Sequence, residues 1–400
     1  MNRRGICLKY LLFLAAIIII FLLAYIASNN KKRIKVKPLV TMLVLQLIFA
    51  FLLLNTEVGF VIITAVSSLF DHLLSYAAEG INFVFGGMAN EGAGPFFINV
   101  LLPIVFISVL IGIAQYIKVL PFIIRYLGII LSKVNGLGKL ESYNAVASAV
   151  FGQSEVFISV KKQLPYIPEH RLYTLCTSAM STVSASILGA YMTMIDPKYV
   201  ITALVLNLFG GFMVANIINP YEVSAEEDII DVQEGEKQTF FEVLGEYIMD
   251  GFKVAIIVGA MLIGFVALIS MINHVFDLIF GVSFQTVLGY VFSPLAFIVG
   301  VPAADMVKAG TIMATKLLSN EFVAMMDLGK IADSLSSKTV GIISVFLVSF
   351  ANFSSIGIIT GAVKGLNEAK GNQVAKFGLK LLYGATLVSL LTAAITSIML

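Results

Sequence analysis

Residues 145–160 are AVASAVFGQSEVFISV, in which the tetrapeptide Gly-Gln-Ser-Glu (152–155) separates two uncharged apolar runs. Within a membrane, the carboxylate of Glu155 is costly unless it meets water, a ligand or another polar group. Gly152 lets the chain break and turn here, and the broken helix ends leave backbone groups free to bind. A helix-breaking loop without a function is the alternative interpretation. The stretch favours a broken, membrane-embedded segment whose tip lines a polar chamber.

A second stretch of this kind lies in the other half of the chain. Residues 319–322, Ser-Asn-Glu-Phe, follow an apolar arm, and Gly-Val-Pro (300–302) upstream predicts a break before that arm. An exposed loop acid is the alternative interpretation of Glu321, because Asp327 and Lys330 follow soon after. The chain therefore has two candidate segments with a carboxylate at the tip.

The composition of the 400-residue chain indicates an integral membrane protein. Hydrophobic residues make up 59% of the chain, charged residues only 12%, and the mean hydropathy is +0.97. Soluble domains carry about 25% charged residues. A net charge of +2 gives no sign of nucleic-acid binding. Because Cys7 and Cys176 offer neither a disulfide framework nor metal-ligand spacing, we expect no metal and no cofactor.

Uncharged runs of roughly 20 residues predict eight transmembrane helices, since that length crosses the hydrocarbon core. We expect these spans at 10–30, 38–55, 92–117, 172–195, 199–221, 254–273, 339–363 and 381–400. Residues 57–91 are less regular and predict an interfacial helix and a loop. A cleaved signal peptide is the alternative for the first run, but the basic cluster from Lys31 to Lys37 is typical of a cytoplasmic anchor.

The two halves share one order of segments: a plain span, a mixed segment with a carboxylate, a Ser/Asn-rich span and a plain apolar span. The mixed segments are residues 132–165 and 284–326. If each enters and leaves the membrane on one side, the basic clusters all fall on the cytoplasmic side. This pattern predicts an all-α membrane protein with two re-entrant helical hairpins in inverted repeats, in which the substrate lies near the bilayer midplane.

Polar residues also lie within the spans that follow the hairpins. Asn352 is an amide in mid-span, and its donors and acceptor need partners. The serine-rich run at 178–186 is explained at least as well by helix packing. Glu321 and Asn352 suit the vicinal hydroxyls of a sugar, and Gln153 and Glu155 suit the edge of a heterocycle. A phosphate ligand is disfavoured, because neither hairpin tip nor either polar span contains an arginine.

The chain resembles the concentrative nucleoside transporters, most of all the bacterial NupC-like branch, in motifs spread over nearly its whole length. These motifs are Gly-Gln-Ser-Glu (152–155), MSTVSASILGAY (180–191), Asn-Pro-Tyr (219–221), Ser-Asn-Glu-Phe (319–322) and Phe-Ala-Asn-Phe-Ser-Ser (350–355). The resemblance implies a secondary active symporter that imports nucleosides of the uridine, cytidine and adenosine class. It also implies a homotrimer and a multi-pass location in the bacterial plasma (inner) membrane.

The resemblance further implies a mobile transport domain that moves against a scaffold. The expected parts are scaffold spans one to three with the interfacial helix (1–131), transport half one with hairpin one and spans four and five (132–221), an acidic cytoplasmic connector (222–249), scaffold span six (250–276), and transport half two with hairpin two and spans seven and eight (277–400).

By the same resemblance, two sets of residues bind the substrate. The residues that face the nucleobase are Gln153, Ser154, Glu155 and Ile187. The residues that hold the ribose are Glu321, Asn352 and Ser355, and Phe350 packs nearby.

The coupling ion is where this sequence departs from part of the family. Sodium-coupled members use an Asn side chain and a Ser side chain where this chain has Ser148 and Thr182, beside Phe151 and Val183. Losing an amide oxygen weakens a cation site without abolishing it, so sodium coupling is the alternative and proton coupling is the preferred hypothesis. Either substrate-site carboxyl group can carry the proton, since burial favours its neutral form.

Two other classes of protein fit the sequence less well. A membrane-embedded enzyme could use the paired carboxylates as acid and base, but the sequence offers no nucleophile paired with a histidine and no soluble catalytic domain. A channel is disfavoured because the two halves carry unlike polar sets and not a repeated ring.

Overall fold

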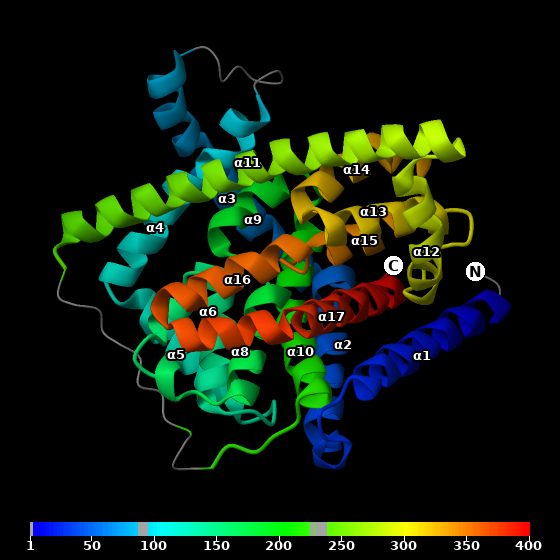
Figure 1. The fold of residues 1–400 in the computed structure, drawn as a ribbon, viewed down its shortest axis with the longest axis horizontal. Coiled ribbons are helices and arrows are strands. Elements are labelled where there is room, and N and C mark those ends of the chain that lie inside the picture. The colour runs from blue at the N-terminus through cyan, green and yellow to red at the C-terminus, as the bar shows by residue number, and fades with distance from the viewer. Residues whose placement is uncertain (1–2, 87–94, 225–227, 229–237) are drawn as a thin grey trace.

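The computed structural model describes residues 3–86, 95–224, 228 and 238–400, and within these ranges the chain is helical without β-strands. A π-helical turn, Phe97–Leu101, leads into α4. The helices are α1 (Arg3–Ile26), α2 (Val36–Asn55), α3 (Glu57–Phe85), α4 (Pro103–Tyr116), α5 (Val119–Ser132), α6 (Lys139–Phe151), α7 (Val156–Ser159), α8 (Glu169–Ser181), α9 (Ala185–Met192), α10 (Pro197–Ile218), α11 (Phe240–Phe280), α12 (Phe284–Ile298), α13 (Met306–Leu318), α14 (Glu321–Ile331), α15 (Ser337–Leu347), α16 (Phe353–Leu366) and α17 (Glu368–Met399) (Figure 1).

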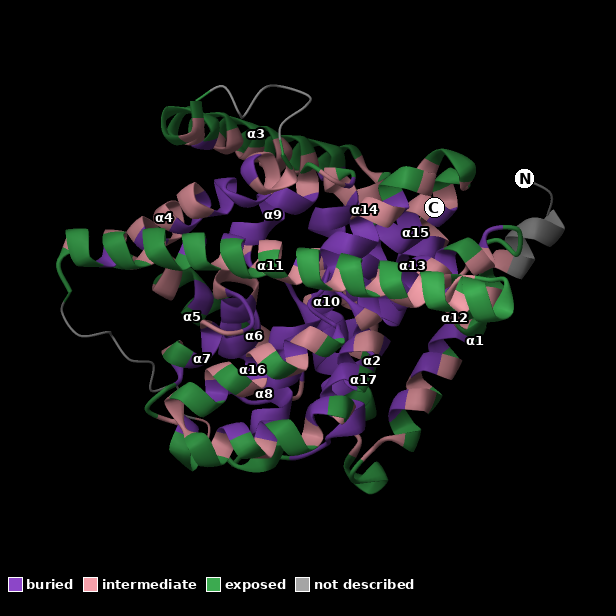
Figure 2. Cartoon of the chain, turned by 45° about the horizontal axis from the view of Figure 1, so that its top comes forward, coloured by how far each residue is buried: buried purple, intermediate pink, exposed green. Residues whose placement is uncertain are grey.

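Eight helical segments of the described chain are long and apolar enough to cross a membrane, as expected, but they are not the eight predicted. All but α3 overlap a predicted span. Helix α3 is continuous over 29 residues, where an interfacial helix and a loop were expected. Its buried residues are Gly59 and Ala77, so most of its surface is exposed (Figure 2). Its interfacial position stays a prediction, and part of the expected loop, residues 87–91, lies outside the described ranges.

The seventh predicted span, residues 339–363, consists of two helices and not of one. The chain forms α15 and α16 there, with a break between Leu347 and Phe353. Hydropathy registers only that the run is apolar, whereas Asn352 caps the first turn of α16 with its side chain and so starts a new helix. The fourth predicted span, residues 172–195, is likewise split into α8 and α9.

The order of helices repeats along the chain. The first set consists of α4, α5, α6 with α7, α8 with α9, and α10. The second set has its helices in the same order: α11, α12, α13 with α14, α15 with α16, and α17. Each set contains a first span (Phe97–Tyr116 in one set and α11 in the other), a connecting helix, a helical hairpin, a broken helix and a long final helix. The expected break at residues 300–302 is present, since α12 ends at Ile298 and Gly300 has a φ of +97°. The opposite orientation of the two sets stays a prediction.

Burial separates the helices into a core and a surface. In the most apolar 18-residue stretch of each span, 89% of the residues are buried for α8 with α9, 83% for α10 and 83% for α17, against 11% for α11. In Figure 2 the buried residues gather around α10, α13 and α15, and the exposed residues lie along α3 and α11. The broken helix formed by α8 and α9 and the first half of the other, α15, therefore lie within the core, whereas α16 buries only Ser355, Ile359 and Val363.

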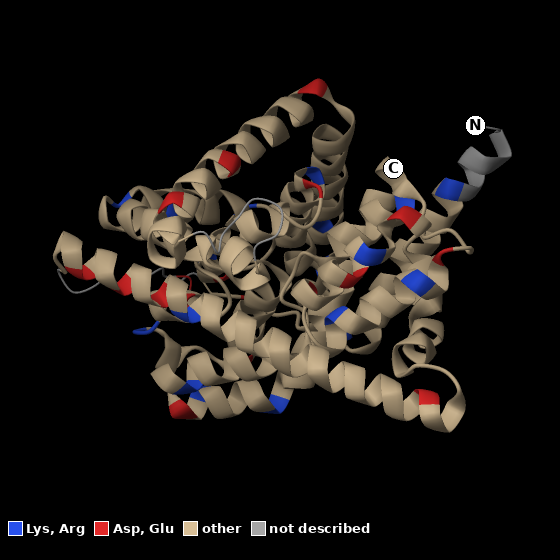
Figure 3. Ribbon diagram, turned by 90° about the horizontal axis from the view of Figure 1, so that it is seen from above, with Lys and Arg blue, Asp and Glu red and all other residues tan. Residues whose placement is uncertain are grey.

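Helix α11 is much longer than the predicted sixth span, 254–273. It begins at Phe240 because Thr239 and Glu242 form a capping box, so part of the expected connector is helical. The helix carries no Lys, Arg, Asp or Glu between Lys253 and Asp277, a length sufficient to cross a bilayer (Figure 3).

Candidate functional site

Glu321 lies at the start of α14, where two broken helices reach it. The side chain of Asn320 caps α14 by accepting from the Val323 N–H at 3.0 Å. Glu321 is 4% exposed, which excludes the interpretation as an exposed loop acid. Tyr191 of α9 donates to its Oε1 at 2.6 Å, and Asn352 donates from Nδ2 to its Oε2 at 3.0 Å. The carboxylate is thus held from two sides by groups outside its own hairpin.

The side-chain amide of Asn352 binds both the start of α16 and the Glu321 carboxylate. Its Oδ1 accepts from the Ser355 N–H at 2.9 Å and from Ser354 Oγ at 2.6 Å, which fixes the first turn of α16. The same turn leaves Ser355 Oγ buried and without a hydrogen-bond partner. The structure therefore brings together Glu321, Asn352 and Ser355, three residues that the sequence assigned to one subsite.

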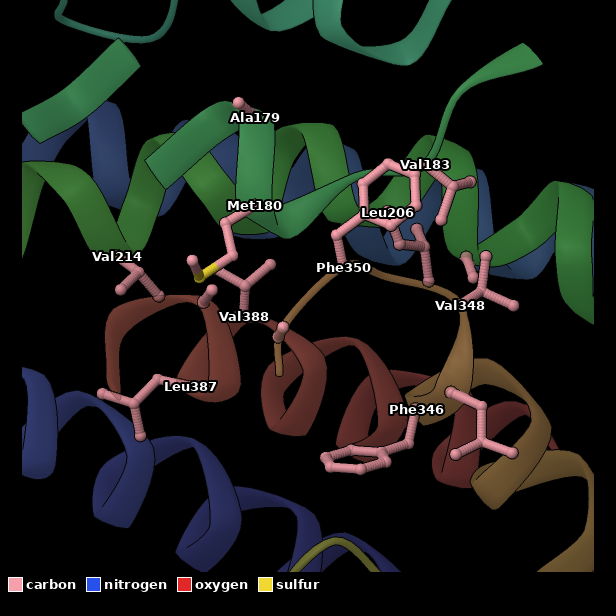
Figure 4. Packing of buried hydrophobic residues seen from close by; sticks show 14 of the residues in the cluster. Ala179, Met180, Val183, Leu206, Val214, Phe346, Val348, Phe350, Leu387 and Val388 are labelled. Carbon is pink, nitrogen blue, oxygen red and sulfur yellow. The ribbon is translucent and has the colours of Figure 1, made fainter. Parts of the chain in front are cut away.

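The breaks of the two split helices meet at Phe350. Its backbone N–H donates to the carbonyl of Thr182 at 3.1 Å, which joins the break after α15 to the break after α8. Figure 4 shows the Phe350 ring on the side of the segment that carries Val183, and Phe346 on the α17 side. Asn207 of α10 also donates to the Val348 carbonyl at 2.6 Å. Backbone groups freed by the breaks thus bind other core elements.

Hairpin one turns at Gly152, which has a φ of +99°. A side chain is strained in this conformation, so glycine ends α6 here. A Cβ atom at Gly152 would lie 3.1 Å from both Glu155 Oε2 and Ser184 Cβ. The carboxylate of the hairpin tip therefore lies close to the start of α9. Gln153 is 8% exposed and its Oε1 is buried without a hydrogen-bond partner, and Ser154 is half-buried.

Helix α9 connects the two groups of predicted site residues. Ser184 at its start lies beside hairpin one, Ile187 is buried in its first turn, and Tyr191 near its end binds Glu321. A rise of about 1.5 Å per residue places Ser184 and Tyr191 about 10 Å apart along the helix, a distance comparable with a small molecule of two rings. The predicted residues therefore flank one short helix.

The residues predicted for an ion site or its remnant are buried or half-buried. Ser148 Oγ donates to the Asn144 carbonyl at 2.7 Å, Phe151 is half-buried, and Thr182 and Val183 are buried. Beside Thr182 lies a cavity of about 10 Å³, which is about the size of one water molecule. The cavity is lined by Ala145, Ser178, Thr182, Asn207, Leu208 and Gly211.

The sequence prediction missed three features of this region. Tyr191 is the last residue of the motif at 180–191, and its contact with Glu321 was not predicted. Lys316 is completely buried, and its Nζ donates to three neutral oxygens, with the Glu321 carboxylate of the same hairpin as its acidic neighbour. Glu141 and Arg171 form a buried ion pair at the base of hairpin one, although no pattern at their spacing marks it.

A helical membrane protein with paired hairpins and broken core helices around a buried polar site has the architecture of a secondary transporter. Sequence patterns described as Na+ dependent nucleoside transporter N-terminus, nucleoside recognition, and Na+ dependent nucleoside transporter C-terminus match residues 15–88, 97–198 and 199–397. The chain belongs to this family, the concentrative nucleoside transporters, and to its NupC-like branch.

Bacterial relatives match over nearly their whole lengths. The purine nucleoside transport protein NupG of Bacillus subtilis is 37% identical over 393 residues, which cover 97% of this chain and 99% of that protein. The nucleoside permease NupC of Helicobacter pylori is 30% identical over 399 residues, 95% of each chain. CNTnw in an inward-facing, substrate-bound state has a TM-score of 0.92 at 28% identity, covering 98% of this chain and 99% of that chain. The chain is therefore a nucleoside transporter of the bacterial plasma membrane and not an enzyme.

Proposed function

We propose that the chain imports nucleosides by symport with protons. The observation that carries this proposal is the buried Glu321 carboxylate, which Tyr191 and Asn352 hold in place beside the unpartnered hydroxyl of Ser355. Each carboxylate oxygen can accept one more hydrogen bond beyond the one it already accepts. Two vicinal hydroxyls are donors of that kind, so the ribose binds at Glu321, Asn352 and Ser355, with Phe350 packing nearby.

The base end of the substrate lies at hairpin one. The buried, unpartnered Oε1 of Gln153 accepts from a ring or exocyclic N–H, and Glu155 and Ser154 supply further polar atoms. Ile187 gives an apolar wall on the intervening α9. Such a site reads groups that uridine, cytidine and adenosine all possess, and the name of the purine nucleoside transporter NupG supports including purines.

The proton is the preferred coupling ion because Ser148 supplies a hydroxyl where sodium-coupled members of the family have an amide oxygen. A sodium ion requires several oxygen ligands at once. The Ser148 hydroxyl replaces an amide, and the Thr182 carbonyl already accepts from the Phe350 N–H. A carboxyl group that binds a proton needs no such cage, and Glu155 and Glu321 are both available for this role. Sodium coupling is the alternative that the experiment below distinguishes.

In this proposal the two transport halves move together as one unit against the scaffold. The transport halves are residues 132–221 and 277–400, the scaffold is residues 1–131 and 250–276, and residues 222–249 form the connector. The hydrogen bond from Phe350 to Thr182 supports a joint movement, because it ties the two halves together at their helix breaks. By analogy with the family, three copies assemble into a homotrimer.

Uptake into sealed vesicles tests the proposal. Purified protein is reconstituted, and labelled uridine uptake is measured with an inward proton gradient, then with an inward sodium gradient at equal pH, and with choline in place of sodium. The expected result is accumulation driven by the proton gradient and unchanged by choline. Competition by cytidine, adenosine and guanosine defines the range. Dependence on sodium would replace the proton in the proposal, and no accumulation of any nucleoside would reject it.

A further inference from the structure

Lys316 of α13 is a completely buried cation whose hydrogen bonds are all made to neutral oxygens. Its Nζ donates to the Phe346 carbonyl at 2.6 Å, to Ser349 Oγ at 2.7 Å and to Ser389 Oγ at 3.1 Å. An ammonium group has three donors, and each has an acceptor here. A buried charge within a membrane is expensive, so the arrangement calls for a function.

The acceptors of Lys316 mark the end of a helix. Phe346 is the penultimate residue of α15, where the last carbonyls have no partner within the helix and carry a partial negative charge. Nζ lies 4.4 Å from the centre of the Phe346 ring, which adds a cation–π contact. Ser349 lies in the break itself and contacts Ser389 of α17 at 2.8 Å. Lys316 therefore caps the first half of the broken helix.

The opposite charge of the same hairpin lies at the other side of this break. Glu321, five residues further along, accepts from Asn352, the capping residue of α16. The first turn of a helix carries a partial positive charge. Hairpin two thus places a cation at the negative end of α15 and an anion next to the positive end of α16. Both charges complement the helix ends that face them.

We propose that Lys316 is a positioning residue for the nucleoside site. It fixes the path of residues 348–352 between α15 and α16, so that the amide of Asn352 donates to Glu321. The side chains of Asn352 and Glu321 are then positioned to bind the ribose hydroxyls. The proposal rests on the ribose site described above. Lys316 does not contact the nucleoside itself, and it acts through the break.

The test compares binding of uridine and 2′,3′-dideoxyuridine to the purified full-length protein by isothermal titration. In Lys316→Met, uridine binding weakens about tenfold, equivalent to about 1.4 kcal/mol, while binding of the dideoxy compound changes less than about twofold. Lys308→Met is the matched control, because Lys308 is on the same helix but exposed and bonded to Ser334. It leaves both affinities unchanged.

A second variant keeps the test decisive if Lys316→Met does not fold. Ser389→Ala removes one acceptor and leaves the cation in place, so it reduces the preference for uridine over the dideoxy compound in the same direction, to a smaller extent. Unchanged preference in both folded variants, or equal loss for the two ligands, overturns the role of Lys316 alone. A wild-type protein that does not prefer uridine overturns the ribose site and this inference with it.

Discussion

The phenol of Tyr191 and the carboxylate of Glu321 are joined by a hydrogen bond of 2.6 Å, although the two residues are 130 positions apart in the chain. The bond connects the second part of broken span four to hairpin two. The ring of Phe322, next to Glu321, also packs edge-to-face on Tyr191 at 5.0 Å between centroids. One residue of the first half thus orients the tip of the second hairpin.

Replacing Tyr191 by Phe removes this bond and keeps the ring. Hydrogen bonds to charged groups contribute about 1.5–3 kcal/mol, so we expect uridine binding to weaken by roughly tenfold or more. Isothermal titration measures the change. Tyr383→Phe is the control, because the Tyr383 hydroxyl donates to the Leu23 carbonyl at an exposed position. Equal affinities in the two variants would show that Tyr191 does not orient Glu321.

Glu321→Gln keeps the size of the side chain and removes the charge. The amide can accept from only one of the two donors at Tyr191 and Asn352 without reorganisation, so we expect uridine accumulation to be lost while the protein still reaches the membrane. Uptake in cells, with immunoblots of the membrane fraction, measures both quantities. Glu368→Gln in the exposed first turn of α17 is the control. Normal uptake by Glu321→Gln would remove this residue from the site.

Much of the helical pattern was predictable from the sequence, because apolar runs and glycine turns are local signals. Helix α2 ends at Asn55, where the second predicted span ends, and hairpin one turns at Gly152. The breaks within spans four and seven were not predicted, because hydropathy averages over them. The partners of Lys316 and Tyr191 come from helices distant in sequence, and one sequence read by itself carries no signal for such pairs.

Gly152→Ala tests the crowding at the tip of hairpin one. The new Cβ would lie 3.1 Å from the Glu155 carboxylate and 3.1 Å from the Ser184 side chain, so the tip must shift. We expect at least a tenfold loss of uridine affinity by titration. Gly281→Ala separates backbone strain from crowding, since Gly281 has a φ of +69° and nothing within 4 Å of its added Cβ. If both variants lose affinity equally, the effect comes from strain alone.

The ion pair between Arg171 and Glu141 fixes the base of hairpin one to α8. Arg171 Nε and Nη2 donate to the two oxygens of Glu141 at 2.6 and 3.0 Å, and Tyr221 donates to Oε1 at 2.9 Å. Removing one partner of a buried pair costs about 3–5 kcal/mol, because the other charge is left uncompensated. We therefore expect Arg171→Met to lower the melting temperature in detergent clearly, and Glu141→Gln combined with Arg171→Met to recover much of the loss. Lys253→Met breaks an exposed pair with Asp250 and is expected to leave the melting temperature unchanged. A double variant no more stable than Arg171→Met would mean that the lost stability comes from packing of the arginine stem and not from the unpaired Glu141.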